Sequence, residues 1–135
     1  MAGHINRLFS FDPANNTWAE LTAFVGGARP YGRKDSSAAV LGGRMWLFGG
    51  WTDDPAVGPY GGVLNDVYVY DPAASGSTAG SWFGPLQAAS PPQPRAGHYL
   101  VAAAGRMYSF GGYTDWPGSR TPSAVQDDSS SSYWL

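Results

Sequence analysis

The sequence predicts an all-β chain built from repeated units of four short antiparallel strands. A block of eleven residues, 43–53, recurs 62 positions later at 105–115 with eight identities, which indicates a repeated structural unit. Glycine (19) and proline (11) are abundant, charged residues make up 13%, and no helical periodicity is visible. Aromatic residues reach 15% of the 135, so a packed single domain is expected rather than disorder.

The repeated units divide into strands that follow one another in a fixed order. We expect strands near residues 8–11, 18–21, 36–41, 44–49, 66–70, 82–86, 98–103 and 106–111. Gly42-Gly43 supplies the tight turn of a hairpin, and Gly49-Gly50 is expected to end the buried strand that follows it. The third strand of the unit stops at Asp71-Pro72, a turn-forming pair. Residues 133–135 are expected to begin another such strand.

A second repeat flanks the first and ends in a tryptophan. Residues 8–14 match 67–73 at an offset of 59, and Trp18 and Trp82 follow the two copies. We expect both rings to be buried between one twisted sheet and the next, because a large apolar plate fills that space well. Counting strands gives one complete unit and two partial ones.

Taken in order, these motifs resemble the Kelch repeat. That family pattern is an arginine near a histidine, a glycine turn, an aromatic strand ending in Gly-Gly, a strand ending in Tyr-Asp, and a spaced tryptophan. The matching residues are Arg33, Gly43, 46–50, Tyr70-Asp71 and Trp82 in one copy, and Arg95, His98, Gly105 and 108–112 in the other. Ser36 replaces the histidine in the first copy, and the spacing of about 60 exceeds the roughly 50 that is typical.

The resemblance implies a Kelch-type β-propeller segment, with one complete four-stranded blade flanked by two partial blades. The expected domain is 1–135, with the second half of blade 1 at about 5–25, blade 2 at about 33–88, and the first part of blade 3 at about 95–135, including a flexible loop at 116–132. Propellers close with about four to eight blades. We therefore expect uncovered sheet faces that carry Phe9, Phe11, Trp46, Phe48, Tyr68 and Tyr108. An isolated monomer is disfavoured relative to a longer polypeptide, a ring-completing oligomer or a complex with other subunits.

The residue inventory argues against an enzyme. The chain has no cysteine, two histidines and no Gly-x-Ser-x-Gly elbow. The copper chemistry of Kelch-like galactose oxidases requires a cysteine and is excluded for these residues. His98 is expected to be a core or hydrogen-bonding histidine, and Asp53-Asp54 and Asp127-Asp128 lack the fixed spacing of a calcium loop. We expect no catalytic residue, cofactor or metal.

The loops carry the residue types of a protein contact site, aromatic side chains interleaved with charges. The candidate partner-binding residues are Arg33, Trp51, Asp53, Tyr60, Arg95, Tyr113, Asp115 and Trp116. For Arg33 and Arg95 the alternative is that they brace neighbouring blades through carbonyl or carboxylate contacts. With a net charge of -2 and no basic stripe, nucleic acid is not an expected partner.

These observations favour a protein-interaction or scaffold module that contacts partners through its inter-strand loops and blade faces. One alternative is a structural subunit, or an ordered fragment, within a large assembly. Another is part of a Kelch-propeller enzyme whose site lies outside this chain. No signal peptide or membrane-spanning segment is visible in the sequence, which favours a cytoplasmic location.

Overall fold

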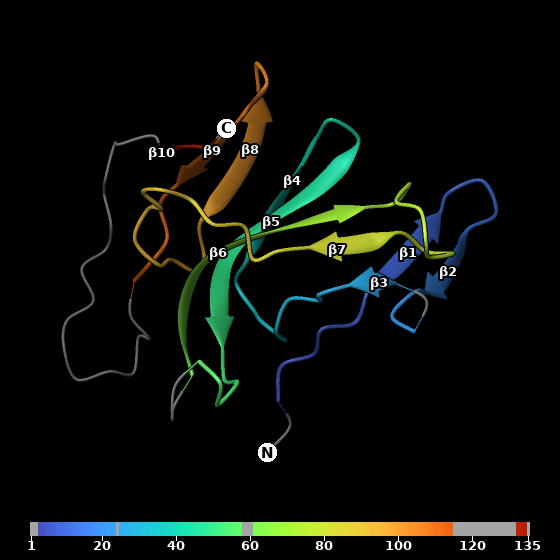
Figure 1. The fold of residues 1–135 in the computed structure, drawn as a ribbon, viewed down its shortest axis with the longest axis horizontal. Coiled ribbons are helices and arrows are strands. Elements are labelled where there is room, and N and C mark those ends of the chain that lie inside the picture. The colour runs from blue at the N-terminus through green and yellow to red at the C-terminus, as the bar shows by residue number, and fades with distance from the viewer. Residues whose placement is uncertain (1–2, 24, 58–60, 115–131, 135) are drawn as a thin grey trace.

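The computed structural model describes residues 3–23, 25–57, 61–114 and 132–134, and these residues form ten strands and no helix (Figure 1). The strands are β1 (Phe9–Asp12), β2 (Thr17–Glu20), β3 (Gly26–Gly27), β4 (Ser37–Leu41), β5 (Arg44–Thr52), β6 (Gly62–Asp71), β7 (Ser81–Phe83), β8 (Tyr99–Ala103), β9 (Arg106–Phe110) and β10 (Ser132–Trp134). They make a two-stranded sheet β1-β2, a central sheet β3-β7-β6-β5-β4, and a three-stranded sheet β10-β9-β8. The predicted all-β class is confirmed.

The central sheet contains the four antiparallel strands of the predicted blade. Strands β4 to β7 each pair with the next in chain order. Gly42 and Gly43 join β4 to β5 with φ angles of 61° and 73°, the left-handed pair that a tight hairpin turn requires. The two-residue strand β3 adds a parallel partner to β7 and was not predicted. Two glycines carry no strand pattern that could have indicated it.

Gly49 and Gly50 were expected to end their strand, but the strand continues beyond them. The pairing of β5 with β6 shifts register between Phe48 and Gly50 and then continues to Thr52. The two glycines have φ angles of 59° and 100°, so they form a bulge within a longer strand. The connection between the second and third strands therefore spans 53–61, which is shorter than the gap between the expected strands at 44–49 and 66–70.

The hairpin β8-β9 repeats the geometry of β4-β5. Its turn residues Ala104 and Gly105 have φ angles of 49° and 73°. Strand β10 pairs with the other edge of β9 over Ser132–Trp134, close to the predicted strand start at 133. The loop expected at 116–132 lies almost wholly outside the described residues.

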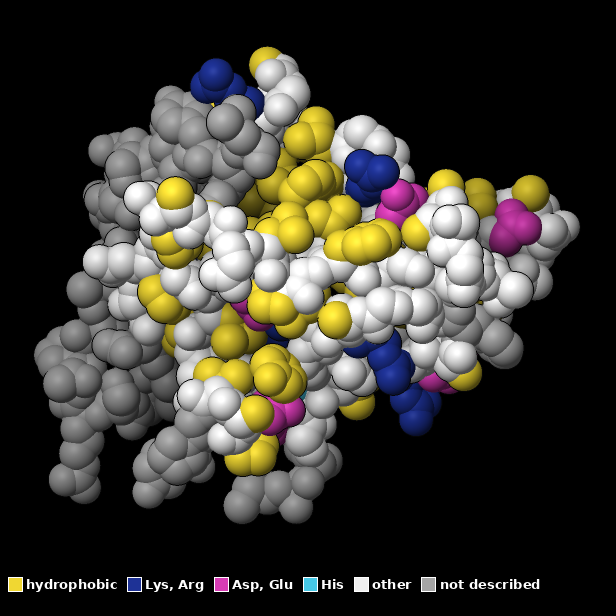
Figure 2. All heavy atoms as spheres, in the orientation of Figure 1, with side chains coloured by type: hydrophobic (Ala, Val, Ile, Leu, Met, Phe, Trp, Pro, Cys, Tyr) yellow, Lys and Arg dark blue, Asp and Glu magenta, His cyan; other side chains and the backbone are white. Residues whose placement is uncertain are grey.

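The core lies where the central sheet packs on β8-β9. Phe48 and Val67 from one sheet meet Leu100 and Met107 from the other. Figure 2 shows hydrophobic side chains gathered between the β4-β5 and β8-β9 hairpins. Phe48 had been expected on an uncovered face, but it is 1% exposed because the second sheet covers it.

Of the other aromatic residues expected on uncovered sheet faces, some are exposed and others are buried or half-buried. Tyr68, also expected to be uncovered, is 5% exposed because Trp82, Arg33 and the backbone near Gly84 surround its ring. Phe9 and Phe11 are exposed as expected. Trp46 and Tyr108 are half-buried.

The two tryptophans of the second repeat differ. Trp82 is buried, as predicted, but its described ring contacts are with Tyr70 and Tyr68 of its own sheet and not with the next sheet, as had been expected. Trp18 is 70% exposed, so the prediction of burial was wrong. Its ring contacts Phe11 within the two-stranded sheet, where all eight strand residues are exposed.

Candidate functional site

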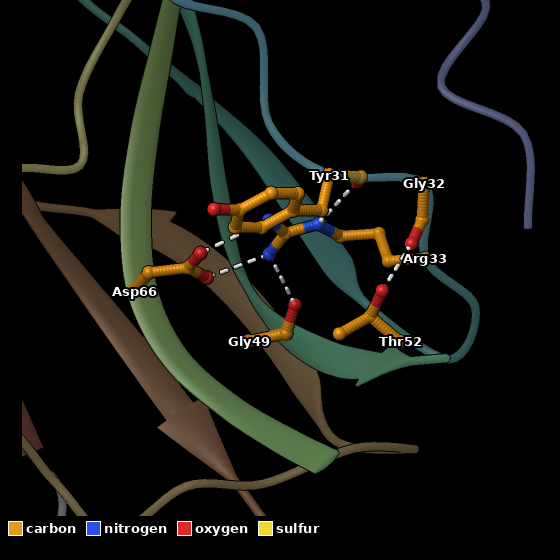
Figure 3. Close-up of polar contacts among 6 residues, drawn as sticks. All are labelled: Tyr31, Gly32, Arg33, Gly49, Thr52 and Asp66. Atoms are coloured by element: carbon orange, nitrogen blue, oxygen red, sulfur yellow. Dashed lines mark hydrogen bonds and ion pairs between the residues drawn. The ribbon is translucent and has the colours of Figure 1, made fainter. Parts of the chain in front are cut away.

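Arg33 lies at the bulge within β5, where this strand pairs with β6 (Figure 3). Its Nη1 donates to Asp66 Oδ1 at 2.6 Å and to the Gly49 carbonyl at 2.9 Å, and its Nη2 donates to Asp66 Oδ2 at 3.0 Å. The guanidinium also lies 5.5 Å from the centre of the Tyr68 ring. With its side chain 5% exposed, Arg33 forms a buried, bidentate ion pair that holds two strands together.

Arg95 repeats part of this arrangement 62 residues later. Its Nη1 donates to the Gly111 carbonyl at 3.4 Å, the counterpart of Gly49, and the residue is 1% exposed. Its backbone also connects the two sheets, accepting a hydrogen bond from Gly50 and donating one to Leu64. Both arginine side chains bind a carbonyl of their own unit, so the bracing of neighbouring blades and a direct contact with a partner both stay predictions.

Trp51 lies beside Lys34 at the end of β5. The two residues exchange backbone hydrogen bonds of 2.8 and 2.9 Å, and Lys34 Nζ lies 5.0 Å from the centre of the indole ring. The His4 ring meets the indole edge-on at 5.1 Å. This packing holds Trp51 half-buried, with one face covered by a cation.

Asp53 holds the N-terminal segment against this end of the sheet. Its Oδ1 accepts a hydrogen bond from the His4 backbone at 3.2 Å and lies 2.8 Å from His4 Nδ1. These contacts lower the pKa of the Asp53 carboxyl below its usual value. His4, which the sequence did not connect to Asp53, thus fixes this carboxylate from the N-terminal segment.

Tyr113 occupies in the last unit the place that Trp51 has in the central one. It forms a backbone bridge with Ala96, as Trp51 does with Lys34. Its hydroxyl donates to Asp35 Oδ2 at 2.7 Å. Burial, together with this carboxylate, raises the pKa of Tyr113 to about 12.

Trp51 and Tyr113 therefore contact neighbouring residues of one short segment, Lys34 and Asp35. We call this surface, formed by Lys34, Asp35, Trp51, Asp53 and Tyr113, the loop edge. It unites three of the predicted partner-binding residues with two that the sequence analysis missed. Tyr60, Asp115 and Trp116, and also Asp127-Asp128, lie outside the described residues.

His98 belongs to the core rather than to the loop edge. It is 5% exposed, and neither ring nitrogen has a hydrogen-bond partner among the described residues. In the described part of the chain no three His, Cys, Asp or Glu residues gather to hold a metal ion. The described residues also contain no helix long and apolar enough to cross a membrane.

Comparison with known proteins gives a consistent family. The KLHDC2/KLHL20/DRC7 Kelch-repeats domain matches residues 2–134. Similar proteins include the Rab9 effector protein with kelch motifs of Mus musculus, 31% identical over 82% of this chain and 27% of that protein. The tip elongation aberrant protein 1 of Schizosaccharomyces pombe is 29% identical over 79% of this chain and 8% of its own length. The N-acetylneuraminate epimerase of Pasteurella multocida is 30% identical over 70% of this chain and 22% of its own length.

Proposed function

The chain belongs to the Kelch-repeat family, and we propose that it is a protein-binding module whose contact surface is the loop edge. Kelch repeats generally mediate protein–protein interaction. The chain spans about a quarter or less of these relatives' lengths, and they include proteins named as an effector and as an epimerase. The proposal for this chain therefore rests on its own surface.

The observation that carries the proposal is the matched placement of Trp51 and Tyr113. Both are half-buried aromatic residues at the same position of successive units, and they are held by contacts with the adjacent residues Lys34 and Asp35. A ring that is already held in place loses little conformational entropy when it binds, so such residues are efficient anchors. Charges of both signs next to them supply a polar rim.

In this proposal the two arginines act from beneath the surface. Arg33 fixes the bulge that leads to Trp51, and Arg95 ties the two sheets together. Tyr60, Asp115 and Trp116 remain candidate members of the same contact surface. Binding rather than catalysis is proposed, because the loop edge presents aromatic and charged groups that are already engaged with one another.

A matched pair of variants tests the proposal by quantitative affinity capture from the source cells. The double variant Trp51→Ala/Tyr113→Ala removes the two aromatic anchors of the loop edge. The control Trp18→Ala/Tyr99→Ala removes one tryptophan and one tyrosine that are 70% and 74% exposed elsewhere. The wild type and the control should capture the same proteins other than this chain itself, and the loop-edge variant should lose those proteins while keeping its cooperative melting.

Equal capture by both variants would contradict the loop edge as the binding surface. A structural role within a larger assembly is the second candidate, favoured by the exposure of Tyr99 and Phe110 on a sheet face. In that case the control variant, rather than the loop-edge variant, loses the proteins other than this chain that the wild type captures.

A further inference from the structure

The two larger sheets pack on each other in a defined way. Phe48 of β5 lies against Leu100 and Met107 of the β8-β9 hairpin, and Ala39 and Ala102 flank the contact. The Leu100 amide donates to the Ser37 hydroxyl at 2.9 Å, which fixes β8 along β4. One face of β4-β5 thus covers one face of β8-β9.

The opposite face of the β8-β9 hairpin is apolar and exposed. Tyr99, Val101 and Phe110 are 74%, 55% and 61% exposed, and Tyr99 lies directly opposite Phe110 across the two strands. These three residues are the counterparts, 62 positions later, of Ser37, Ala39 and Phe48. They therefore occupy the positions that, one unit earlier, make the contact between sheets.

A groove of about 490 Å³ between β1-β2 and the central sheet offers the complementary surface. Its apolar lining includes Leu8, Phe9, Leu21, Val40, Met45 and Tyr70. Val40, which is 70% exposed, and Met45 are the counterparts of Ala102 and Met107, two residues of the surface on which β4-β5 packs. The groove thus carries, one unit earlier, the residues that correspond to the surface of β8-β9 on which β4-β5 packs.

We propose that the β8-β9 hairpin of one copy of this chain docks into this groove of a second copy. Val101 then packs on Val40, and Phe110 packs on Met45, in the manner of Phe48 on Met107. The occupant is a second copy because one chain carries both halves of the contact. The β8-β9 hairpin and the β1-β2 sheet, which borders the groove, lie on opposite sides of the central sheet (Figure 1). Such a contact joins two different surfaces and is therefore head-to-tail.

The backbone of β1 supports the same arrangement. Among the described residues β1 pairs with β2 on one side only. The strand has the place in its unit that β6 has in the central sheet, where β6 pairs with β5. A docked hairpin brings its β9 to the open edge of β1 of the other copy. In the docked state β1 takes the edge of β9 that β10 occupies over three residues in the single chain.

Sedimentation velocity of the full chain over a concentration series tests the proposal with three variants. Val101→Lys places a charge on the hairpin face and Val40→Lys places one in the groove. Ile5→Lys changes an aliphatic residue of equal exposure, 71%, that does not line the groove. The wild type and Ile5→Lys should associate with rising concentration, and the other two variants should associate at least about tenfold more weakly.

Mixing the two weakened variants gives the decisive result. A Val101→Lys chain keeps an intact groove and a Val40→Lys chain keeps an intact hairpin, so the mixture should form dimers of one copy each and no larger species. A monomeric wild type at every concentration overturns the proposal, and so does a mixture that stays monomeric. The loop edge has no part in this contact, so the Trp51→Ala/Tyr113→Ala variant should associate like the wild type.

Discussion

The His98 ring stands edge-on to the Phe48 ring at the contact between the two sheets, with 5.0 Å between centroids and 68° between planes. Both side chains are buried. Burial lowers the pKa of His98 from 6.5 to about 4, and the charge of Arg95 adds to this effect. The imidazole is therefore neutral at neutral pH, and the contact depends on its remaining so.

Acidification should weaken the contact between sheets. Because the pKa of His98 is lower in the folded chain than in the unfolded chain, its contribution is full above pH 6.5 and is lost as the pH falls towards 4. The loss should be on the order of 3 kcal/mol at most. Urea unfolding at about pH 7 and about pH 4.5 measures it, and His98→Leu should show a shallower decline. Equal declines for both chains would rule out His98 as the cause.

The Arg33–Asp66 pair should contribute far more to stability than the Arg44–Asp71 pair. Both place a guanidinium nitrogen within 2.7 Å of a carboxylate oxygen, but the arginine side chains are 5% and 54% exposed. Arg33→Gln should lower the free energy of unfolding by about 3–5 kcal/mol, since it leaves Asp66 without its partner in a mostly buried site. Arg44→Gln should cost less than about 1 kcal/mol. Similar losses in denaturant unfolding would show that burial does not separate the pairs.

The two tryptophans of the second repeat should respond differently to truncation. Trp82→Ala removes a buried ring and should cost about 3–5 kcal/mol. Trp18→Ala removes an exposed one and should change the stability of the folded chain by less than about 1 kcal/mol. Thermal unfolding at a chain concentration low enough to prevent association compares them directly. A large loss for Trp18→Ala would mean that its ring is covered in solution.

Two matching glycines, Gly49 in the bulge of β5 and Gly111 just after β9, separate the effect of backbone conformation from that of close approach. Gly49 and Gly111 are counterparts in the repeat, with φ angles of 59° and 72°. A Cβ on Gly49 would lie 2.5 Å from the Arg95 carbonyl, whereas one on Gly111 would meet nothing within 4 Å. Gly111→Ala should cost about 1–2 kcal/mol for the left-handed backbone, and Gly49→Ala should cost more. Equal losses in the free energy of unfolding for the two variants would contradict the prediction, since the Arg95 segment would then move away from a Cβ on residue 49 at little cost.

The repeat in the sequence predicted most of the strands, because residues 43–53 and 105–115 carry their turn and alternation signals locally. It could not distinguish a strand end from a bulge at Gly49-Gly50, since both structures favour glycine. It also could not distinguish Trp18 from Trp82. The two follow the same motif, and their burial depends on which surface packs against them.

The candidate site was predicted only in part, because its contacts join residues far apart in the sequence. His4 meets Asp53, and Tyr113 meets Asp35, 78 positions away. No local pattern reports such pairs. One missed signal was available elsewhere. Asn6 and Asn65 each lie two residues before the matching segments 8–14 and 67–73. Their side chains donate to the carbonyls of Pro30 and Pro92, which are themselves 62 positions apart.

Site-specific photo-crosslinking in the source cells tests the central claim, that the loop edge is the surface that binds a partner, most directly. A benzoylphenylalanine side chain placed at Tyr113 reports on the loop edge, and one placed at Tyr99 reports on an exposed sheet face. We expect irradiation to link the Tyr113 position to a different protein, while the Tyr99 position yields adducts with a second copy of this chain. Adducts with a different protein from the Tyr99 position, and none from Tyr113, would contradict the account.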